Sequence, residues 1–184
     1  MFYKLKNCRN GEEAQYETRV EITEKSGRIA FLFEAKHSEY YCPHEGYNKI
    51  HSEGDACEVL IGSDPERREY YEMEISPRGD LMLARITHNG YEPSGRPLLN
   101  VNLIDESFIS GWAKKTDDGY IAEISFEKSA VMTDGDEIYF NAYRLETEGG
   151  TLGNKKHLLA LNPTLRPKFH VRECFLWLKD YVNK

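Results

Sequence analysis

The chain has 184 residues, of which 24 are Lys or Arg and 31 are Asp or Glu, so its formal net charge at pH 7 is −7. An acidic surface does not neutralise phosphate groups, and this charge argues against nucleic acid or an anionic membrane as a partner. No apolar run approaches the roughly 20 residues that span a bilayer, and the length predicts a single domain over residues 1–184.

The N-terminal residues and the cysteines bear on the cellular compartment. Residues 1–10 (MFYKLKNCRN) lack the apolar stretch and the cleavage site of a secretory signal, which predicts a cytoplasmic protein. The four cysteines are widely spaced and form no C-x-x-C motif. We therefore expect reduced, packed thiols and neither a zinc site nor a dithiol redox site.

The first half of the chain is typical of antiparallel hairpins. Apolar and polar residues alternate over residues 17–24 and 28–36, on either side of a Lys-Ser-Gly turn. A polar segment rich in Tyr and His follows at residues 37–54, and its length makes it a candidate binding loop. Further strands are predicted over residues 55–62, 69–76 and 81–87.

The second half continues the same pattern. A Gly- and Pro-rich stretch at residues 89–97 precedes the next strand, and an Asp-Gly hairpin turn lies near residue 118. Strands are predicted over residues 98–104, 111–115, 119–127 and 137–146, with a short helical turn at 128–132. About eight to ten short strands without long helices predict an all-β fold, an antiparallel β-sandwich of the jelly-roll or immunoglobulin-like kind.

Several strands carry charged residues within alternating apolar frames. Glu58, Glu74 and Arg144 are such residues, and Glu72 shares a strand face with Glu74. Such a stripe is ordinarily a solvated face. However, carboxylates, guanidinium groups and aromatic rings are also the side chains that bind sugars, because charged groups hydrogen-bond hydroxyls and rings pack on C–H faces.

The closing segment, residues 161–177 (LNPTLRPKFHVRECFLW), combines two prolines with Phe169 and His170. Prolines lower the entropy cost of ordering a loop, so this segment is suited to present an aromatic ring and an imidazole to a ligand. The alternative is that Phe169 plugs one end of the sandwich and His170 satisfies backbone groups. Phe175 and Trp177 alternate in a closing strand and are expected in the core.

Metal and cofactor signatures are weak. No cofactor is predicted, and whether a metal ion binds is left open. Acid-rich turns at residues 64–66, 117–118 and 134–136 could hold a structural calcium ion, but none has the spacing of a calcium-binding loop. Turn formation is the favoured interpretation.

Taken in order, six motifs resemble carbohydrate-binding module family 9, within the wider DOMON-like β-sandwich group. They are RIAFLFEAK, GDACEVLIG, YYEMEISPRG, a W…DDGY-x-x-E-I strand pair, GDEIYFNAYR and a closing NPT…FH…F segment.

The resemblance implies specific contacts. Glu58 would bond sugar hydroxyls, Phe169 would stack on a sugar ring, and Arg144 would lie on the binding sheet. The family's second stacking aromatic falls at Ser52, where His51 or Tyr47 would have to replace it.

Three functional hypotheses follow. The first is a non-catalytic carbohydrate-binding protein whose saccharide ligand contacts Phe169, Glu58 and Arg144, with further contacts from Glu74 and His170. The second is a glycan-processing hydrolase, or an accessory domain of one, with Glu58 and Glu74 as its carboxylate pair. The third, implied by DOMON relatives, is haem binding between Met73 and His88 or His170. The oligomeric state is left open.

Overall fold

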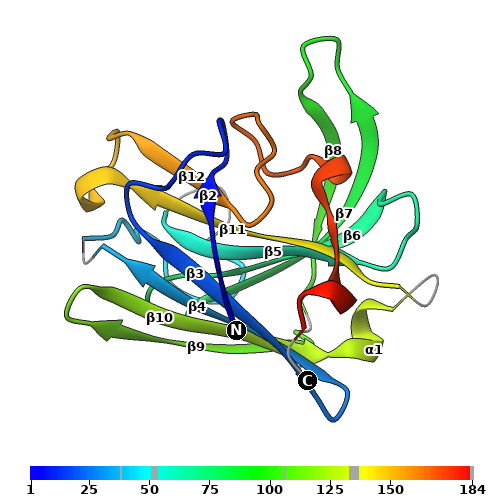
Figure 1. Ribbon diagram of the computed structural model, residues 1–184, viewed down its shortest axis with the longest axis horizontal. Helices are drawn as coiled ribbons and strands as arrows, with labels where there is room; N and C mark the ends of the chain where they lie inside the picture. Colours follow the sequence, from blue (N-terminus) through cyan, green and yellow to red (C-terminus); the bar gives the residue numbers. More distant parts are fainter. Residues whose placement is uncertain (38, 51–53, 106, 133–136, 183–184) are drawn as a thin grey trace.

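The structure is a computed structural model that describes residues 1–37, 39–50, 54–105, 107–132 and 137–182. Two antiparallel sheets pack face to face as a sandwich (Figure 1). The smaller sheet has the strand order β1-β3-β4-β10-β9. Its strands are β1 (Phe2–Lys4), β3 (Thr18–Lys25), β4 (Arg28–Lys36), β9 (Ile109–Thr116) and β10 (Gly119–Glu127).

The larger sheet has the order β2-β12-β11-β5-β6-β7-β8, and β13 pairs with β11. Its strands are β2 (Lys6–Asn7), β5 (Ala56–Gly62), β6 (Glu69–Ile75), β7 (Leu81–Tyr91), β8 (Pro97–Leu103), β11 (Tyr139–Thr147), β12 (Lys156–Ala160) and β13 (Leu176–Trp177).

Among the described residues, helical structure is limited to single turns: α1 (Lys128–Val131), η1 (Glu148–Gly150), η2 (Arg172–Cys174) and η3 (Leu178–Asp180). Within the described ranges, no helix has the length and apolar character needed to cross a membrane.

The predicted β-sandwich is confirmed, and most strand bounds agree to within two residues. β4 and β10 coincide with the predicted ranges. β7 runs to Tyr91, beyond the predicted end at residue 87, because it continues past an irregularity to pair with β8. β1, β2 and β12 were not predicted, since each is short and β12 begins with a charged residue.

Alternation along the strands produces two apolar layers rather than one. Between the sheets lie residues such as Phe31, Phe126 and Met73, all fully buried. The outer face of the larger sheet carries a second buried cluster that includes Leu60 and Tyr143. Residues 161–177, here called the C-terminal segment, contribute Phe169 and Phe175 to this cluster. Because both faces of the sheet are covered, all of β5 is buried.

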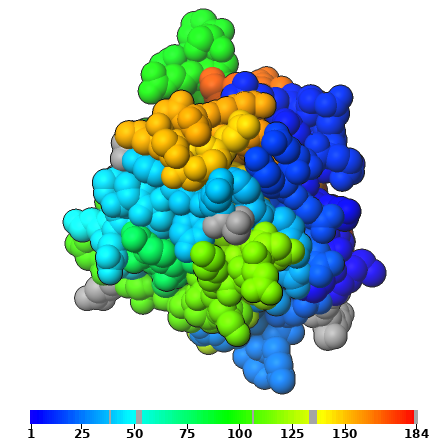
Figure 2. All heavy atoms as spheres, turned by 90° about the vertical axis from the view of Figure 1, so that its left-hand side faces the viewer, coloured from blue at the N-terminus to red at the C-terminus, as the bar shows by residue number. Residues whose placement is uncertain are grey.

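Residues 39–50 are fixed at one end of the sandwich, the end that faces the viewer in Figure 2. The Asn48 side chain accepts a hydrogen bond from Leu83 N (2.9 Å) and donates one to Ile104 O (2.8 Å). Gly46 N donates to Asp80 at 2.8 Å. The hairpin formed by the end of β7 and the start of β8 projects beyond the rest of the molecule (Figures 1 and 2).

Candidate functional site

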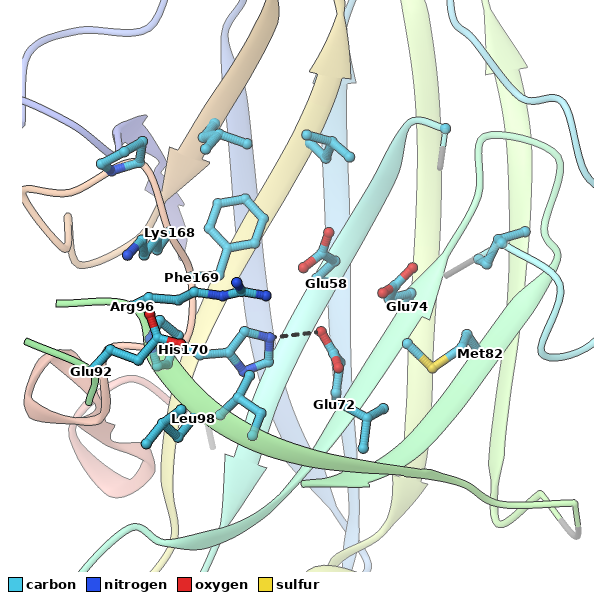
Figure 3. A pocket seen from close by; sticks show the side chains of 18 residues that line it. Glu58, Glu72, Glu74, Met82, Glu92, Arg96, Leu98, Lys168, Phe169 and His170 are labelled. Carbon is cyan, nitrogen blue, oxygen red and sulfur yellow. Dashed lines mark ion pairs between the residues drawn. The ribbon is translucent and has the colours of Figure 1, made fainter. Parts of the chain in front are cut away.

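A cavity of about 760 Å³ opens on the outer face of the larger sheet. Its floor is formed by β5, β6 and β7, with Glu58, Glu72, Glu74 and Met82 facing the opening. The C-terminal segment forms one wall, and the β7–β8 hairpin forms another (Figure 3). This volume is within the range of about 300–1,000 Å³ that is usual for small-molecule sites.

Three carboxylates converge on the floor because of strand alternation and register. Cys57 and Val59 face the core between the sheets, so Glu58 points to the outer face. Glu58 and Glu74 are direct cross-strand partners, and Glu72 lies two residues before Glu74. Carboxylate oxygens of the three residues lie within 4.8 Å of one another. All three residues are buried, with exposed fractions of 5, 8 and 6% for Glu58, Glu72 and Glu74.

Burial and mutual repulsion favour the protonated form of two of these acids. Removal from water raises the pKa of Glu58 well above 4.5, and the charges of Glu74 and Glu72 raise it further. The pKa of Glu74 is raised by the same two causes, burial first and then the charge of Glu72. Among the described residues, neither carboxylate has a hydrogen-bond or ion-pair partner. The floor therefore holds polar groups that a ligand can satisfy.

Glu72 differs from its neighbours because it has a fixed partner. His170 Nε2 lies 3.3 Å from Glu72 Oε1, and His170 Nδ1 lies 2.9 Å from the Tyr70 hydroxyl. A neutral imidazole has one N–H and one acceptor nitrogen, so in the tautomer that donates from Nε2 to Glu72, Nδ1 accepts from the tyrosine. Burial raises the pKa of Tyr70, which keeps its hydroxyl protonated as a donor. These two contacts, with Glu72 and with Tyr70, fix the imidazole of His170 at the cavity wall.

Phe169 presents an aromatic ring at the same cavity. The ring stacks on Tyr143 with a centroid distance of 4.4 Å and an interplanar angle of 23°. The Tyr143 hydroxyl also donates to Phe169 O at 2.8 Å, so one residue orients both the ring and the backbone. Phe169 is only partly buried and lines the cavity beside Glu58 (Figure 3).

Buried side chains hold the C-terminal segment in place. Asn141, fully buried on β11, donates to Asn162 O at 2.8 Å and to Cys174 O at 3.3 Å. The Thr164 hydroxyl donates to the carbonyl of Lys168 at 2.8 Å. Because these contacts lie on both sides of Phe169 and His170, the wall of the cavity is fixed before any ligand arrives.

The β7–β8 hairpin is braced against this segment. Lys168 Nζ donates to Gly95 O at 3.1 Å, and the Tyr91 hydroxyl donates to a Glu173 carboxylate oxygen at 2.6 Å. These contacts join the two walls, so the cavity has a fixed width. Exposed Arg96 extends from the hairpin toward the opening (Figure 3).

Four of the residues predicted as ligand contacts are brought together at this cavity. Glu58, Glu74, Phe169 and His170 all line it.

Arg144, predicted as a ligand contact, does not face the cavity. Arg144 pairs in register with Cys57, so it faces the interior between the sheets and is fully buried. Its guanidinium donates to Thr18 Oγ1 at 2.9 Å and to Lys36 O at 2.8 Å, and lies 3.4 Å from Glu146 Oε2. The residue one position away, Tyr143, is the one that faces the site.

The loop residues proposed as replacements for a second aromatic give no support to that idea. The Tyr47 hydroxyl donates to Ile104 O at 2.8 Å, and Tyr47 packs against the core instead of lining the cavity. His51, like Ser52, lies outside the described residues. Ile50 and Gly54, on either side of that gap, line the cavity.

The structure bears on one of the two haem pairs and on one of the three acid-rich turns. Met73 lies in the core between the sheets, whereas His170 contacts Glu72 on the other face of β6, so this pair does not face one space. Asp64 accepts backbone hydrogen bonds from Glu66, Arg68 and Glu69, as a turn residue does. Residues 134–136 are outside the described part of the chain. In that part, the group with metal-binding spacing is the carboxylate floor.

Sequence reasoning missed the whole hairpin wall. Glu92, Arg96, Leu98 and Leu99 line the cavity, but the stretch at residues 89–97 was interpreted only as a connection. The signal that could have found it is the pairing of β7 with β8, which places this connection beside the strand that carries Met82.

The fold defines a class of architecture, an antiparallel β-sandwich with a cavity on the outer face of its larger sheet. No protein-family model matches the sequence, and no curated protein matches it at significant similarity. Solved structures do match in fold. One is a protein from Bacteroides uniformis ATCC 8492 that is provisionally described as carbohydrate-binding, with 17% identity and a TM-score of 0.72 over 95% of this chain and 84% of that one.

Two further matches are family 9 modules from Caldicellulosiruptor kristjanssonii. The module in complex with cellotriose is 10% identical, with a TM-score of 0.57 over 100% of this chain and 81% of its own. The module in complex with glucose is 13% identical, with a TM-score of 0.51 over 89% of this chain and 81% of its own. At sequence identities of 10–17%, the similarity between this chain and these structures is a similarity of fold.

Proposed function

We propose that this protein binds a saccharide, without cleaving it, in the cavity on the outer face of the larger sheet. One observation carries the proposal: an aromatic ring, an imidazole and two buried, unpartnered carboxylates face the same space. Sugars offer C–H faces to a ring and hydroxyl donors to carboxylates, so both kinds of group are satisfied by one ligand. The fold similarity to modules that bind cellotriose and glucose supports the same function.

The geometry of the cavity supports the contacts that we propose. Phe169 packs on the sugar ring, Glu58 and Glu74 accept hydrogen bonds from hydroxyl groups, and His170 positions Glu72 for a third. Because Phe169 is already stacked on Tyr143 and its backbone is already bonded, little entropy is lost when the ligand arrives.

Calorimetric titration with a panel of mono- and oligosaccharides tests this function. We expect at least one sugar to bind, and Phe169→Ala to weaken its binding at least tenfold, or about 1.4 kcal/mol. Glu123→Gln, a change on β10 in the smaller sheet, is the control and should bind as the wild type does. Absence of heat with every sugar, or unchanged affinity in Phe169→Ala, would overturn the proposal.

Glycoside hydrolysis is the second candidate, favoured by the separation of Glu58 and Glu74. Their oxygens lie within 4.8 Å, close to the roughly 5–5.5 Å between the carboxyl groups of retaining glycosidases. Such enzymes need one protonated and one ionised carboxyl, whereas burial raises the pKa of both residues here, which favours binding. Turnover of aryl glycosides that is lost in both Glu58→Gln and Glu74→Gln would establish hydrolysis instead.

A further inference from the structure

The floor of the cavity holds more acidic groups than a neutral sugar requires. Glu58, Glu72 and Glu74 point into the cavity from one sheet face, and Glu58 and Glu74 are more than nine-tenths buried with no partner among the described residues (Figure 3). No described Lys or Arg lies within ion-pair distance of either. Of the two cations lining the cavity, Lys168 donates to Gly95 O, and Arg96 is exposed at the opening.

Three acceptors arranged in this way match a group with three donors. A protonated primary amine carries three N–H bonds that diverge tetrahedrally. With N–H···O contacts of ordinary length, the three accepting oxygens lie about 4.6 Å apart, a spacing that is compatible with floor oxygens that all lie within 4.8 Å of one another. The positive charge would also remove the repulsion among the three acids and offset the free-energy cost of their desolvation.

The surroundings favour a cation that is attached to an organic body over a bare metal ion. The cavity of about 760 Å³ is far larger than an ion, and Phe169 and Leu99 line it. Ca²⁺ takes six to eight oxygen ligands. Beyond the three floor acids, Glu92 is the other carboxylate in the lining, and it accepts from Ser94 Oγ at 3.1 Å in the hairpin.

We propose that the ligand is an amino sugar with a free amine, whose ammonium group binds among Glu58, Glu72 and Glu74 while its ring packs on Phe169. This inference rests on the proposed function for its saccharide part, and it adds the charge of the ligand. An N-acetylated or unsubstituted hexose of the same shape would leave the buried acids without a counter-charge.

The test compares three matched series by calorimetry at pH 7. Glucosamine, galactosamine and mannosamine are each titrated against the parent hexose and the N-acetyl derivative. At least one free amine should bind ten times more tightly than both of its neutral counterparts. The preference should disappear in Glu74→Gln and in Glu58→Gln, two isosteric changes, and persist in Glu123→Gln.

A pH series gives a second measurement on the wild-type protein. Besides Glu58 and Glu74 themselves, the charged and titratable groups that line or act on this floor are Cys8, Glu72, Glu92, Arg96, Lys156, Lys168 and His170. Because the pKa values of Glu58 and Glu74 are raised, acid solution keeps both acids neutral, and the preference for the amine should be smaller at pH 5 than at pH 7.

The outcomes separate this inference from the proposed function. Neutral hexoses that bind as tightly as the amines would overturn the amino-sugar assignment and leave saccharide binding intact. Ca²⁺ alone binding to the wild type but not to Glu74→Gln, with no competition from an amine, would also overturn it, in favour of a metal site. No binding by any sugar would overturn both.

Discussion

At the residue scale, Tyr143 and Arg144 are neighbours in the sequence but have different structural roles. Tyr143 supports Phe169 at the site, whereas Arg144 holds the interior by bonding Thr18 and Lys36. The residue types at this place could be read from the sequence, but the face that each occupies could not. A shift of one residue in strand register exchanges the two faces, and the register depends on pairing with β5.

Arg144→Met tests this division of roles. The change removes the guanidinium that lies 3.4 Å from the buried Glu146 carboxylate, together with the bonds to Thr18 and Lys36, so we expect the free energy of unfolding to fall by about 3 kcal/mol. Sugar affinity of the folded fraction should stay within about twofold of the wild type. Urea unfolding and calorimetry measure the two quantities, and a large loss of affinity with unchanged stability would return Arg144 to the binding site.

Glu58 makes a prediction about stability and pH. Its pKa is raised in the folded chain, so above about pH 4.5 the folded state holds a proton that the unfolded state has released. The stabilisation from this proton is complete below the unfolded pKa and is lost as the pH rises through the folded pKa.

The stability of Glu58→Gln relative to the wild type should therefore increase as the pH rises from 4 to 8. Urea unfolding across that range measures the difference, and titrating groups that do not interact with Glu58 cancel in the comparison. Glu123→Gln should show no such trend. A difference that is constant with pH would contradict burial as the cause of the shifted pKa.

At the element scale, the cavity depends on how the C-terminal segment is attached. The sequence showed that this segment is rigid and aromatic, but the partners that fix it, Asn141 and Thr164, lie on β11 and within the segment itself. Such long-range bonds leave no periodic signal. The strands, in contrast, could be predicted because alternation is local.

Asn141→Leu should loosen the wall without disturbing the sandwich. The change removes the Asn141 donor from the carbonyl of Asn162, which costs about 1–3 kcal/mol for a buried group, whereas the carbonyl of Cys174 keeps its bond from the Asn162 side chain at 3.0 Å. We expect faster amide hydrogen exchange in residues 162–174 and at least fivefold weaker sugar binding, with β4 and β10 still protected. If amide exchange instead accelerates uniformly across both sheets, Asn141 stabilises the whole fold and does not specifically hold the C-terminal segment.

A substitution in the β7–β8 hairpin tests the other wall of the cavity. Tyr91→Phe removes the bond to Glu173 but keeps the ring, so the free energy of unfolding should change by less than about 1 kcal/mol. We expect the affinity for the sugar to fall twofold to fivefold as the wall becomes less fixed, measured by calorimetry. Full affinity in Tyr91→Phe would show that the hairpin is held by its other contacts.

At the scale of the whole molecule, the sandwich has one cluster between its sheets and another outside the larger sheet. The first cluster follows from alternation and was predictable. The second cluster, and the cavity within it, arise because the C-terminal segment folds back over β5 and β6, and no local pattern specifies that return. For this reason the sandwich and four of the site residues could be predicted, while the hairpin wall could not.

The central claim is that a saccharide binds in the cavity between the C-terminal segment and the β7–β8 hairpin. Amide chemical-shift mapping by NMR, during titration with the tightest-binding sugar of the panel, tests it most directly. We expect the shifts to concentrate in β5, β6, the hairpin and residues 167–170, and to be absent from β9 and β10. Shifts centred on the smaller sheet would contradict this account.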